Sequence, residues 1–373
     1  MKFRRNAPDA AKGLEMAQIE FGVWAPVHGP RAAAHDPQEA YDASWEHNRA
    51  TVIEAETLGY DSVLVAQHTA NPHVPSHDQL EAWTASAGLA ALTHRIEIIA
   101  AIKPALYHPV VLAKMALQIE EISRGRFALN LINAWNRAEF DRAGIPFLDH
   151  DLRYAYGREW LSIVKRLLRG ETVTHRGEHF AIDGYVLAPA GKFRERPRIY
   201  LGGESEPARE LATEHSDVWF INGQPLGAVE GLIADLRARP RLGSPLRFGL
   251  AAFVIARETE AEAQAEHRRL ATLAERDKAD RAIQKANTDP KVVMFQTIAK
   301  NPSVGTNGGT AAGLVGSYDQ VAERIAAFHA AGVEVFMLQF QPFRAEMRRF
   351  AEEIFPRLGR SPATVAASLR DAR

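Results

Sequence analysis

The chain has 373 residues, of which 46% are hydrophobic and 24% are charged, and its formal net charge is -1. A chain of this length and composition buries a large core, and its balanced charge gives no broad attraction to nucleic acid or to an anionic membrane surface. The absence of cysteine excludes disulfides, thiolate metal sites and a cysteine nucleophile.

The N-terminal stretch MKFRRNAPDAAKGLEMAQ carries basic residues but lacks the apolar region of a signal peptide. No later segment approaches the roughly 18 consecutive apolar residues of a membrane span. We therefore expect a cytoplasmic protein without membrane or nucleic-acid partners. The expected organisation is a loose arm at 1–18, one folded domain at 19–360 and a C-terminal tail at 361–373.

Eight apolar runs rich in β-branched or aromatic residues follow one another along the chain. They begin near Ile19, Asp61, Arg95, Arg126, Arg198, Ser216, Arg247 and Val333. Eight helical patterns occur at 37–59, 80–93, 110–123, 154–168, 206–215, 226–239, 260–276 and 318–332. Ser317 is placed to cap the last of these helices and Gly332 to end it.

Near-continuous apolar strands that alternate with helices are typical of a parallel sheet covered on its outer face. Eight such units predict an α/β fold, a closed (β/α)8 or TIM barrel. The extra length falls in two connections, near 140–197 and 273–315, which we expect to be insertions. The second is rich in glycine and has few apolar anchors, so we expect it to be mobile and to act as a lid.

Polar residues gather where the predicted strands end, which is the face that carries the chemistry in such barrels. In chain order they are His28, Gln67, His68, Lys103, Asn133, Trp135, Asn136, Ser205, Asn222 and Gln341. A single histidine after a strand is more often structural than catalytic. Polar groups at seven of the eight strand ends nevertheless indicate a shared binding mouth.

One strand end has the features of a phosphate site. The sequence IYLGGESEPARELATEH predicts a strand, a glycine pair and a polar turn leading into a helix near Pro207. Glycines such as Gly203 let an anion approach the backbone, the helix N-terminus supplies N–H groups, and the Ser205 hydroxyl adds a donor. Many strand–turn–helix corners share this pattern, so alone it predicts only an anion pocket.

The segments NLINAWNRAEFDRAGIPFLDHDLRYAYGREWLSIVKRLL and RPRIYLGGESEPARELATEHSDVWF resemble the bacterial luciferase-like flavin monooxygenases. The similarity is greatest to the group of alkanesulfonate, dimethylsulfone and pyrimidine monooxygenases, and it extends from about residue 20 to EIFPRL near the C-terminus. The resemblance implies a (β/α)8 barrel and an enzyme that takes reduced FMN from a separate NAD(P)H-dependent flavin reductase. It also implies oxygenation of a small molecule with O2, and a homodimer or homotetramer.

The resemblance also implies roles for individual residues. The implied cofactor-binding residues are Gln67, His68 and Asn130 at the flavin ring, Glu139 and Arg153 beside the cofactor, and Tyr154, Gly203 and Ser205 at its phosphate. We expect catalytic roles for His28, which matches the family's active-site histidine, and for Lys103 and Trp135, and no metal site. Arg153 could instead pair with Asp151 at the surface, and Glu139 could be a solvated residue at a helix start.

Departures from the sulfonate pattern leave the substrate open. Where alkanesulfonate monooxygenase has arginine and histidine in the seventh strand, this chain has Ala251 and Phe253, and Gln341 replaces its tyrosine in the eighth. LAAFVIA and AWNRAEF instead resemble the dimethylsulfone enzyme. Lys103 suits an anionic substrate, or could pair with a carboxylate.

The sequence thus predicts an FMN-dependent monooxygenase that oxygenates a small sulfone or alkanesulfonate with C–S cleavage. Three alternatives remain open. One is the same chemistry on a pyrimidine-like or other heteroatom substrate, the second is F420-dependent hydride transfer, and the third is a flavin-binding protein without catalytic activity.

Overall fold

The computed structural model describes residues 19–30, 32–72, 76–277, 288–289, 291–301 and 303–360. The predicted arm at 1–18 and the predicted tail at 361–373 lie outside the described residues. The fold below refers to the described ranges.

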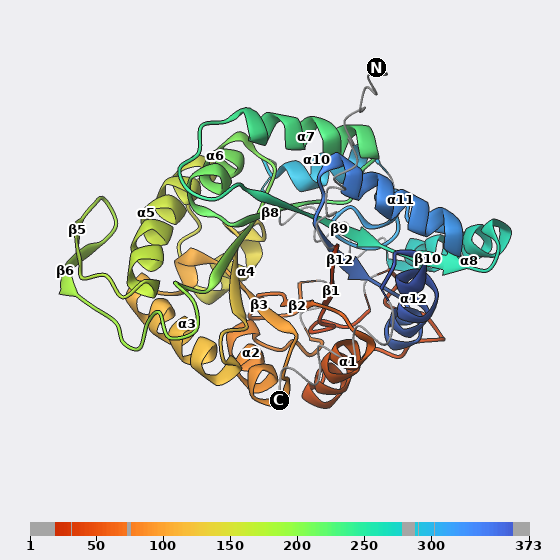
Figure 1. Ribbon diagram of the computed structural model, residues 1–373, viewed down its shortest axis with the longest axis horizontal. Helices are drawn as coiled ribbons and strands as arrows, with labels where there is room; N and C mark the ends of the chain where they lie inside the picture. The colour runs from red at the N-terminus through yellow and green to blue at the C-terminus, as the bar shows by residue number, and fades with distance from the viewer. Residues whose placement is uncertain are drawn as a thin grey trace, which may run out of the picture.

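Eight parallel strands close into a barrel at the centre of the molecule (Figure 1). Their order around it is β1 (Glu20–Trp24), β12 (Val335–Gln339), β9 (Arg247–Phe253), β8 (Val218–Ile221), β7 (Arg198–Gly202), β4 (Phe127–Leu131), β3 (Glu97–Ile102) and β2 (Ser62–Val65). They are the eight strands expected from the apolar runs, so the predicted (β/α)8 barrel is confirmed. Beyond the charged residues at their amino ends, the strands are mostly apolar, because helices cover their outer face.

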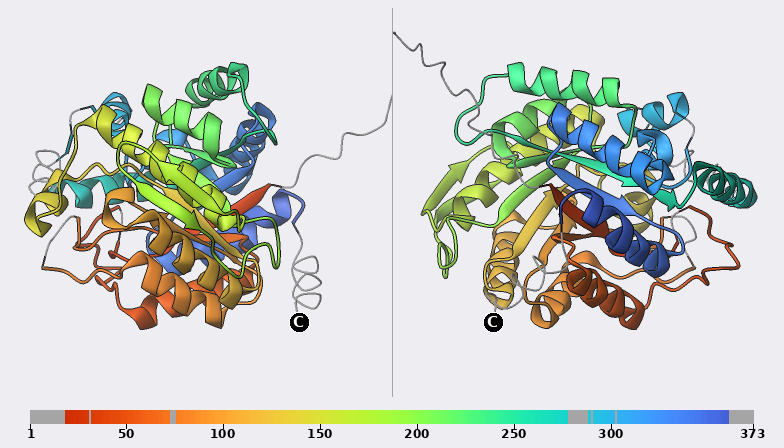
Figure 2. Two further views of the ribbon diagram at one scale, coloured as in Figure 1. Left: turned by 90° about the vertical axis from the view of Figure 1, so that its left-hand side faces the viewer. Right: turned by 45° about the vertical axis from the view of Figure 1, so that its right-hand side comes forward.

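A ring of helices surrounds the barrel (Figures 1 and 2). It consists of α1 (Trp45–Leu58), α2 (Ala82–Leu92), α3 (Pro109–Ser123), α5 (His150–Leu168), α6 (Glu206–His215), α7 (Leu226–Ala238), α11 (Tyr318–Ala331) and α12 (Phe343–Arg357). The sequence patterns predicted all of these except α12. In the described ranges, no helix has both the length and the apolar character needed to cross a membrane.

Capping residues decide where these helices begin and end. α1 begins at Trp45, not near residue 37 as predicted, because the Ser44 side chain accepts a hydrogen bond from the first turn. The predicted cap at Ser317 is confirmed. The Ser317 hydroxyl accepts a hydrogen bond from the Gln320 N–H, and the Gln320 side chain accepts one from the Ser317 N–H. Gly332 ends α11 at a φ of 113°, which favours glycine.

The connection from β4 to β7 holds α4 (Arg137–Ala143), α5 and a hairpin of β5 (Val173–Arg176) and β6 (Ala181–Tyr185). The hairpin projects beyond the ring of helices (Figure 2). His175 contacts Glu159 of α5 at 2.8 Å and holds the hairpin to the barrel. The sequence analysis missed both strands because few of their residues are apolar and buried.

The connection from β9 to β12 contains more helices and strands in its described part than the sequence patterns indicated. Its described part forms β10 (Ile255–Arg257), α8 (Glu260–Ala274), α10 (Val293–Lys300), the short helix η3 (Gly309–Ala312) and β11 (Val315–Ser317). The few apolar anchors expected in this connection include Val304, Ala312 and Leu314, which are buried, and the Gly223 N–H donates to the Asn307 carbonyl at 2.8 Å. These anchors are isolated in sequence, so no periodic pattern predicted them. The expected mobility of the connection and its role as a lid remain predictions.

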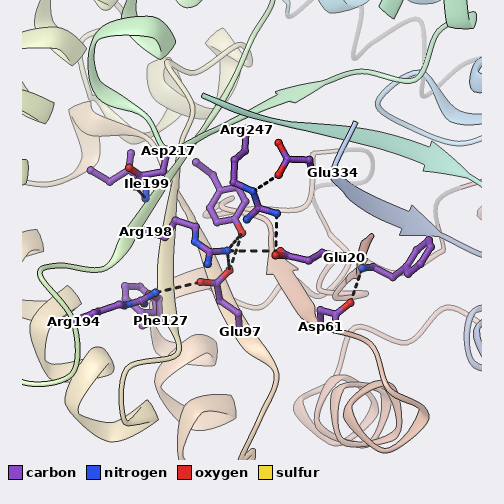
Figure 3. A network of polar contacts seen from close by, with 12 residues as sticks. Glu20, Asp61, Glu97, Phe127, Arg194, Arg198, Ile199, Asp217, Arg247 and Glu334 are labelled. Atoms are coloured by element: carbon purple, nitrogen blue, oxygen red, sulfur yellow. Dashed lines mark hydrogen bonds and ion pairs between the residues drawn. The ribbon is translucent and has the colours of Figure 1, made fainter. Parts of the chain in front are cut away.

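Charged side chains close the barrel at the amino ends of its strands (Figure 3). Arg247 donates to Glu334 at 2.7 Å and to Glu20 at 2.9 Å. On the other side of this end, Glu97 accepts a hydrogen bond from the Tyr200 hydroxyl at 2.7 Å and lies 3.4 Å from Arg198. In barrels of this kind, the amino-end face contributes to stability, whereas chemistry occurs at the carboxyl ends.

Candidate active site

A cavity opens at the carboxyl ends of β4, β7, β8 and β9. Its apolar walls are Trp24, Ile132, Ala134, Trp135, Phe220, Ile221, Ala251, Val292 and Val293. Its polar lining consists mainly of Asn130, Asn133, Arg153, Tyr154, Glu204, Ser205, Asn222 and Asn307. Apolar walls with a few convergent polar groups are typical of a site for a cofactor or a small ligand.

The cavity brings together six of the predicted site residues. They are Asn130, Trp135, Arg153, Tyr154, Gly203 and Ser205. The other five do not line the cavity, and the structure places all of them in buried positions or in buried contacts. They are His28, Gln67, His68, Lys103 and Glu139.

The turn after β7 leaves room for an anion. Gly203 has a φ of 125°, and a Cβ there would lie 3.1 Å from the Tyr154 hydroxyl, so only glycine keeps this corner open. Ser205 is the N-cap of α6, but its side chain makes no capping hydrogen bond. Its hydroxyl and the first N–H groups of α6 are therefore available to a phosphate.

Tyr154 completes this corner from α5. Burial raises the pKa of its phenol, and the neighbouring Ser205 hydroxyl offsets that increase only in part. The phenol therefore stays protonated at neutral pH and can donate a hydrogen bond to an anion.

Buried amides surround the other end of the cavity. The Asn130 Oδ1, the Asn133 Nδ2 and both amide atoms of Gln67 have no hydrogen-bond partner among the described residues. A buried polar atom left without a partner costs about 1–3 kcal/mol, which a ligand can recover. A flavin ring presents N–H and C=O groups at its edge and apolar faces, so these amides and the adjoining walls fit it.

Arg153 lies at the rim of the cavity and is held by protein groups. Its guanidinium donates to the carbonyls of Asn133 at 3.0 Å and Leu148 at 2.6 Å, and to the Asp289 carboxylate at 2.6 Å. Arg153 therefore pairs with Asp289 and not with Asp151. Because Asp289 belongs to the β9–β12 connection, this ion pair ties that connection to the cavity.

Glu204 is a cavity residue that the sequence analysis missed. Its carboxylate accepts hydrogen bonds from the backbone and side chain of Asn222 at 2.7 and 3.1 Å, and lies 3.4 Å from the Thr297 hydroxyl of α10. Burial raises its pKa, although these hydrogen bonds act in the opposite direction. Its place in the GGESE corner, between Gly203 and Ser205, was the available signal.

Gln341 has a structural role. Its Oε1 accepts from the N–H groups of Ala32 and Ala33 at 2.8 and 3.1 Å, and its Nε2 donates to the Ala33 carbonyl at 2.8 Å. It therefore fixes the loop after β1. The interpretation that every polar strand end belongs to one binding mouth is wrong at this position.

Lys103, Glu139 and His68 form a buried polar cluster beside the cavity. The Lys103 Nζ lies 2.5 Å from the Glu139 Oε2, and the His68 Nδ1 is 3.2 Å from each of these atoms. The side chains of Lys103, Glu139 and His68 are 1%, 4% and 9% exposed. The His68 ring packs edge-on against Trp135 at 5.7 Å and lies 6.2 Å from the His28 ring. Trp135 thus separates this cluster from the cavity.

The opposite charges of Lys103 and Glu139 stabilise each other. Burial raises the pKa of Glu139, but the hydrogen bond from His68 and the charge of Lys103 outweigh burial and lower the pKa to about 2. Burial lowers the pKa of Lys103, and the Glu139 carboxylate opposes that change. Glu139 is therefore the counter-ion of Lys103 and not a solvated residue at a helix start.

Comparison with known proteins gives consistent matches along most of the chain. Residues 19–334 match the sequence profile of the family described as luciferase-like monooxygenase. The FMNH2-dependent dimethylsulfone monooxygenase of Pseudomonas putida is 31% identical over 361 residues, covering 91% of this chain and 94% of that protein. The enzyme of the same description from Pseudomonas fluorescens (strain Pf0-1) is 30% identical, covering 96% and 99%. The crystal structure of a long-chain alkane monooxygenase superposes with a TM-score of 0.77 at 17% identity, covering 92% and 91%.

Proposed function

This chain belongs to the luciferase-like monooxygenase family, and from that premise we propose that it uses reduced FMN and O2 to oxygenate a small neutral sulfone with C–S cleavage. A separate NAD(P)H-dependent flavin reductase supplies the reduced FMN. The predicted cytoplasmic location and the predicted homodimer or homotetramer are parts of the same proposal.

The pairing of Lys103 and Arg153 with carboxylates is the observation that favours a sulfone over an alkanesulfonate. A sulfonate is an anion and needs a cation or several donors that the protein does not already use. Lys103 is paired with Glu139 at 2.5 Å, and Arg153 is paired with Asp289 at 2.6 Å. A neutral sulfone needs only hydrogen-bond donors and apolar walls. The substrate named for both Pseudomonas relatives, dimethylsulfone, has this chemistry.

A reductase-coupled assay tests the substrate. With reduced FMN regenerated by a flavin reductase, we expect substrate-dependent oxygen consumption with dimethyl sulfone. We expect kcat/KM to be at least about tenfold lower with methanesulfonate, because the anion would be desolvated without a partner. A preference for methanesulfonate or for a pyrimidine would contradict the proposal. Absence of oxygen consumption with every substrate would favour a flavin-binding protein without catalytic activity.

Some residues of the cavity would bind FMN, and others would exclude water from it. Bound FMN supplies the oxygenating chemistry. In the proposal, Tyr154, Ser205 and the first turn of α6 hold its phosphate, while the cavity amides Asn130 and Asn133 satisfy the edge of its ring. Trp135 forms the wall towards the histidine cluster. The described part of 288–313 covers the cavity and keeps water from the reacting atoms.

Removing either phosphate donor should weaken flavin binding. We expect Tyr154→Phe and Ser205→Ala each to cost about 1.5–3 kcal/mol of FMN affinity, because each deletes a hydrogen bond to a charged group. Anaerobic titration with reduced FMN measures this. Tyr156→Phe is the matched control, since Tyr156 lies on the same helix and does not line the main cavity. Unchanged affinity in both variants would place the phosphate elsewhere.

His28 should affect turnover more than binding. It is buried beside the His68 ring and does not line the cavity, so we expect His28→Ala to lower kcat by at least about tenfold and to change the Kd of reduced FMN only slightly. Stopped-flow turnover and anaerobic titration separate the two quantities. Equal losses in kcat and in affinity would indicate that His28 only supports the fold.

A further inference from the structure

Burying the Lys103–Glu139 ion pair costs desolvation free energy, and neither the barrel fold nor the proposed flavin site requires the pair. A buried ion pair is often no more stabilising than apolar residues of similar volume. The two charges come from different elements, the end of β3 and α4, and neither lines the main cavity. The group that both of them contact is His68, through its Nδ1 atom. A role for the ion pair should therefore be sought at His68.

The geometry balances the two charges at the imidazole. The His68 Nδ1 is 3.2 Å from the ammonium nitrogen of Lys103 and 3.2 Å from the nearer carboxylate oxygen of Glu139. The Lys103 ammonium disfavours protonation of the ring and the Glu139 carboxylate favours it, so the two charges act in opposite directions. The ring is also buried, and burial disfavours the imidazolium ion.

The other groups around His68 keep this arrangement in place. The Thr69 N–H and hydroxyl donate to the second carboxylate oxygen of Glu139 at 2.9 and 3.1 Å, which fixes the carboxylate. Among the described residues, His28 from the loop after β1 is a further titratable group near the ring, and Trp135 covers the ring edge on the cavity side.

We propose that Lys103 and Glu139 are positioning residues that hold His68 as a neutral imidazole against Trp135, and so set the pH range in which the enzyme works. The part of this inference that concerns turnover rests on the proposed function. The part that concerns His68 itself does not, because it can be measured without flavin.

The two single substitutions should shift the midpoint of the His68 titration in opposite directions. Glu139→Gln leaves the ammonium ion alone beside the ring, which makes the imidazole harder to protonate. Lys103→Met leaves the carboxylate alone beside the ring, which stabilises the imidazolium ion. The double variant removes both charges and should return towards the wild type. Damage to the fold alone does not produce opposite shifts.

NMR spectra of the imidazole nitrogens test this in flavin-free protein labelled with [15N]histidine. The His68 signals are identified by their loss in His68→Gln, and folding is checked by circular dichroism. We expect the midpoint of the His68 titration to rise by at least about one pH unit in Lys103→Met and to fall by at least about one in Glu139→Gln. Shifts of the same sign, or no shift, would overturn the proposal. If Lys103→Met does not fold, Glu139→Gln and the double variant still decide the sign.

The pH dependence of turnover provides the second measurement. The acid limb of the kcat/KM profile should move in the same direction as the His68 midpoint in each variant. Opposite NMR shifts with an unmoved profile would overturn the claim that the pair sets the working pH. Opposite NMR shifts in a protein that oxygenates no substrate would leave the positioning role intact and refute the proposed function.

Discussion

Replacing Lys103 by methionine should lower the free energy of unfolding by about 3–5 kcal/mol at pH 8, because a buried carboxylate loses its cation. Glu139 is 4% exposed, and its pKa is lowered to about 2 partly by Lys103 itself, so the variant must either bury an unpaired carboxylate or protonate it. Methionine has nearly the length of lysine and fills the space without leaving a large cavity. The loss therefore reports the unpaired charge and not the lost volume.

Urea denaturation measures this effect, and the chain offers a matched control. Lys192 and Glu121 lie at the same N–O distance of 2.5 Å, but their side chains are 54% and 39% exposed. Lys192→Met should therefore change stability by only about 0–1 kcal/mol. The double variant Lys103→Met with Glu139→Leu should regain most of the loss, because it removes both buried charges. An equal loss in the single and double variants would show that packing, and not charge, explains the result.

The same pair predicts how stability depends on acid pH. The pKa of Glu139 in the folded protein is lowered from 4.5 to about 2, so the stability it contributes is fully present above about 4.5. That contribution is lost as the pH falls from 4.5 towards 2. The stability difference between wild type and Glu139→Gln should therefore shrink over this interval.

The sequence predicted the barrel well because its signals are local. Each strand is a short apolar run that is recognisable by itself, and caps such as Ser317 and Gly332 lie beside the helix they define. The phosphate corner could be predicted for the same reason, since the glycine pair, Ser205 and the start of α6 are adjacent in the chain.

The electrostatic pairings of the site could not be predicted in this way. Lys103 and Glu139 are separated by 36 positions, and Arg153 and Asp289 by 136. No local pattern specifies which carboxylate meets which cation across such distances. The sequence therefore identified Arg153, Lys103 and Glu139 as residues of interest but left their partners open. Those partners change the expected substrate, because they neutralise two cations that could otherwise hold a sulfonate.

The Arg153–Asp289 pair leads to the second large expected effect, on the coupling of oxygen use to product formation. Asp289 precedes α10, and Val292 and Val293 beside it line the cavity. Asp289→Asn keeps the shape of the side chain but removes the charge that faces Arg153 at 2.6 Å. We expect the closed arrangement of 288–301 to lose about 1.5–3 kcal/mol, which shifts its equilibrium towards opening by about 10- to 150-fold.

An open cavity admits water, so reduced FMN should be oxidised more often without oxygenating the substrate. The ratio of hydrogen peroxide to oxygenated product, measured at saturating reduced FMN, should therefore rise several-fold in Asp289→Asn. Asp319→Asn is the control, because Asp319 also bonds an arginine at 2.7 Å but is 77% exposed and lies on α11. If the variant binds reduced FMN more weakly with its product ratio unchanged, the pair organises the cofactor site. A raised ratio with normal affinity instead identifies residues 288–301 as the cover of the cavity, fixed by an arginine that the sequence had indicated for the cofactor.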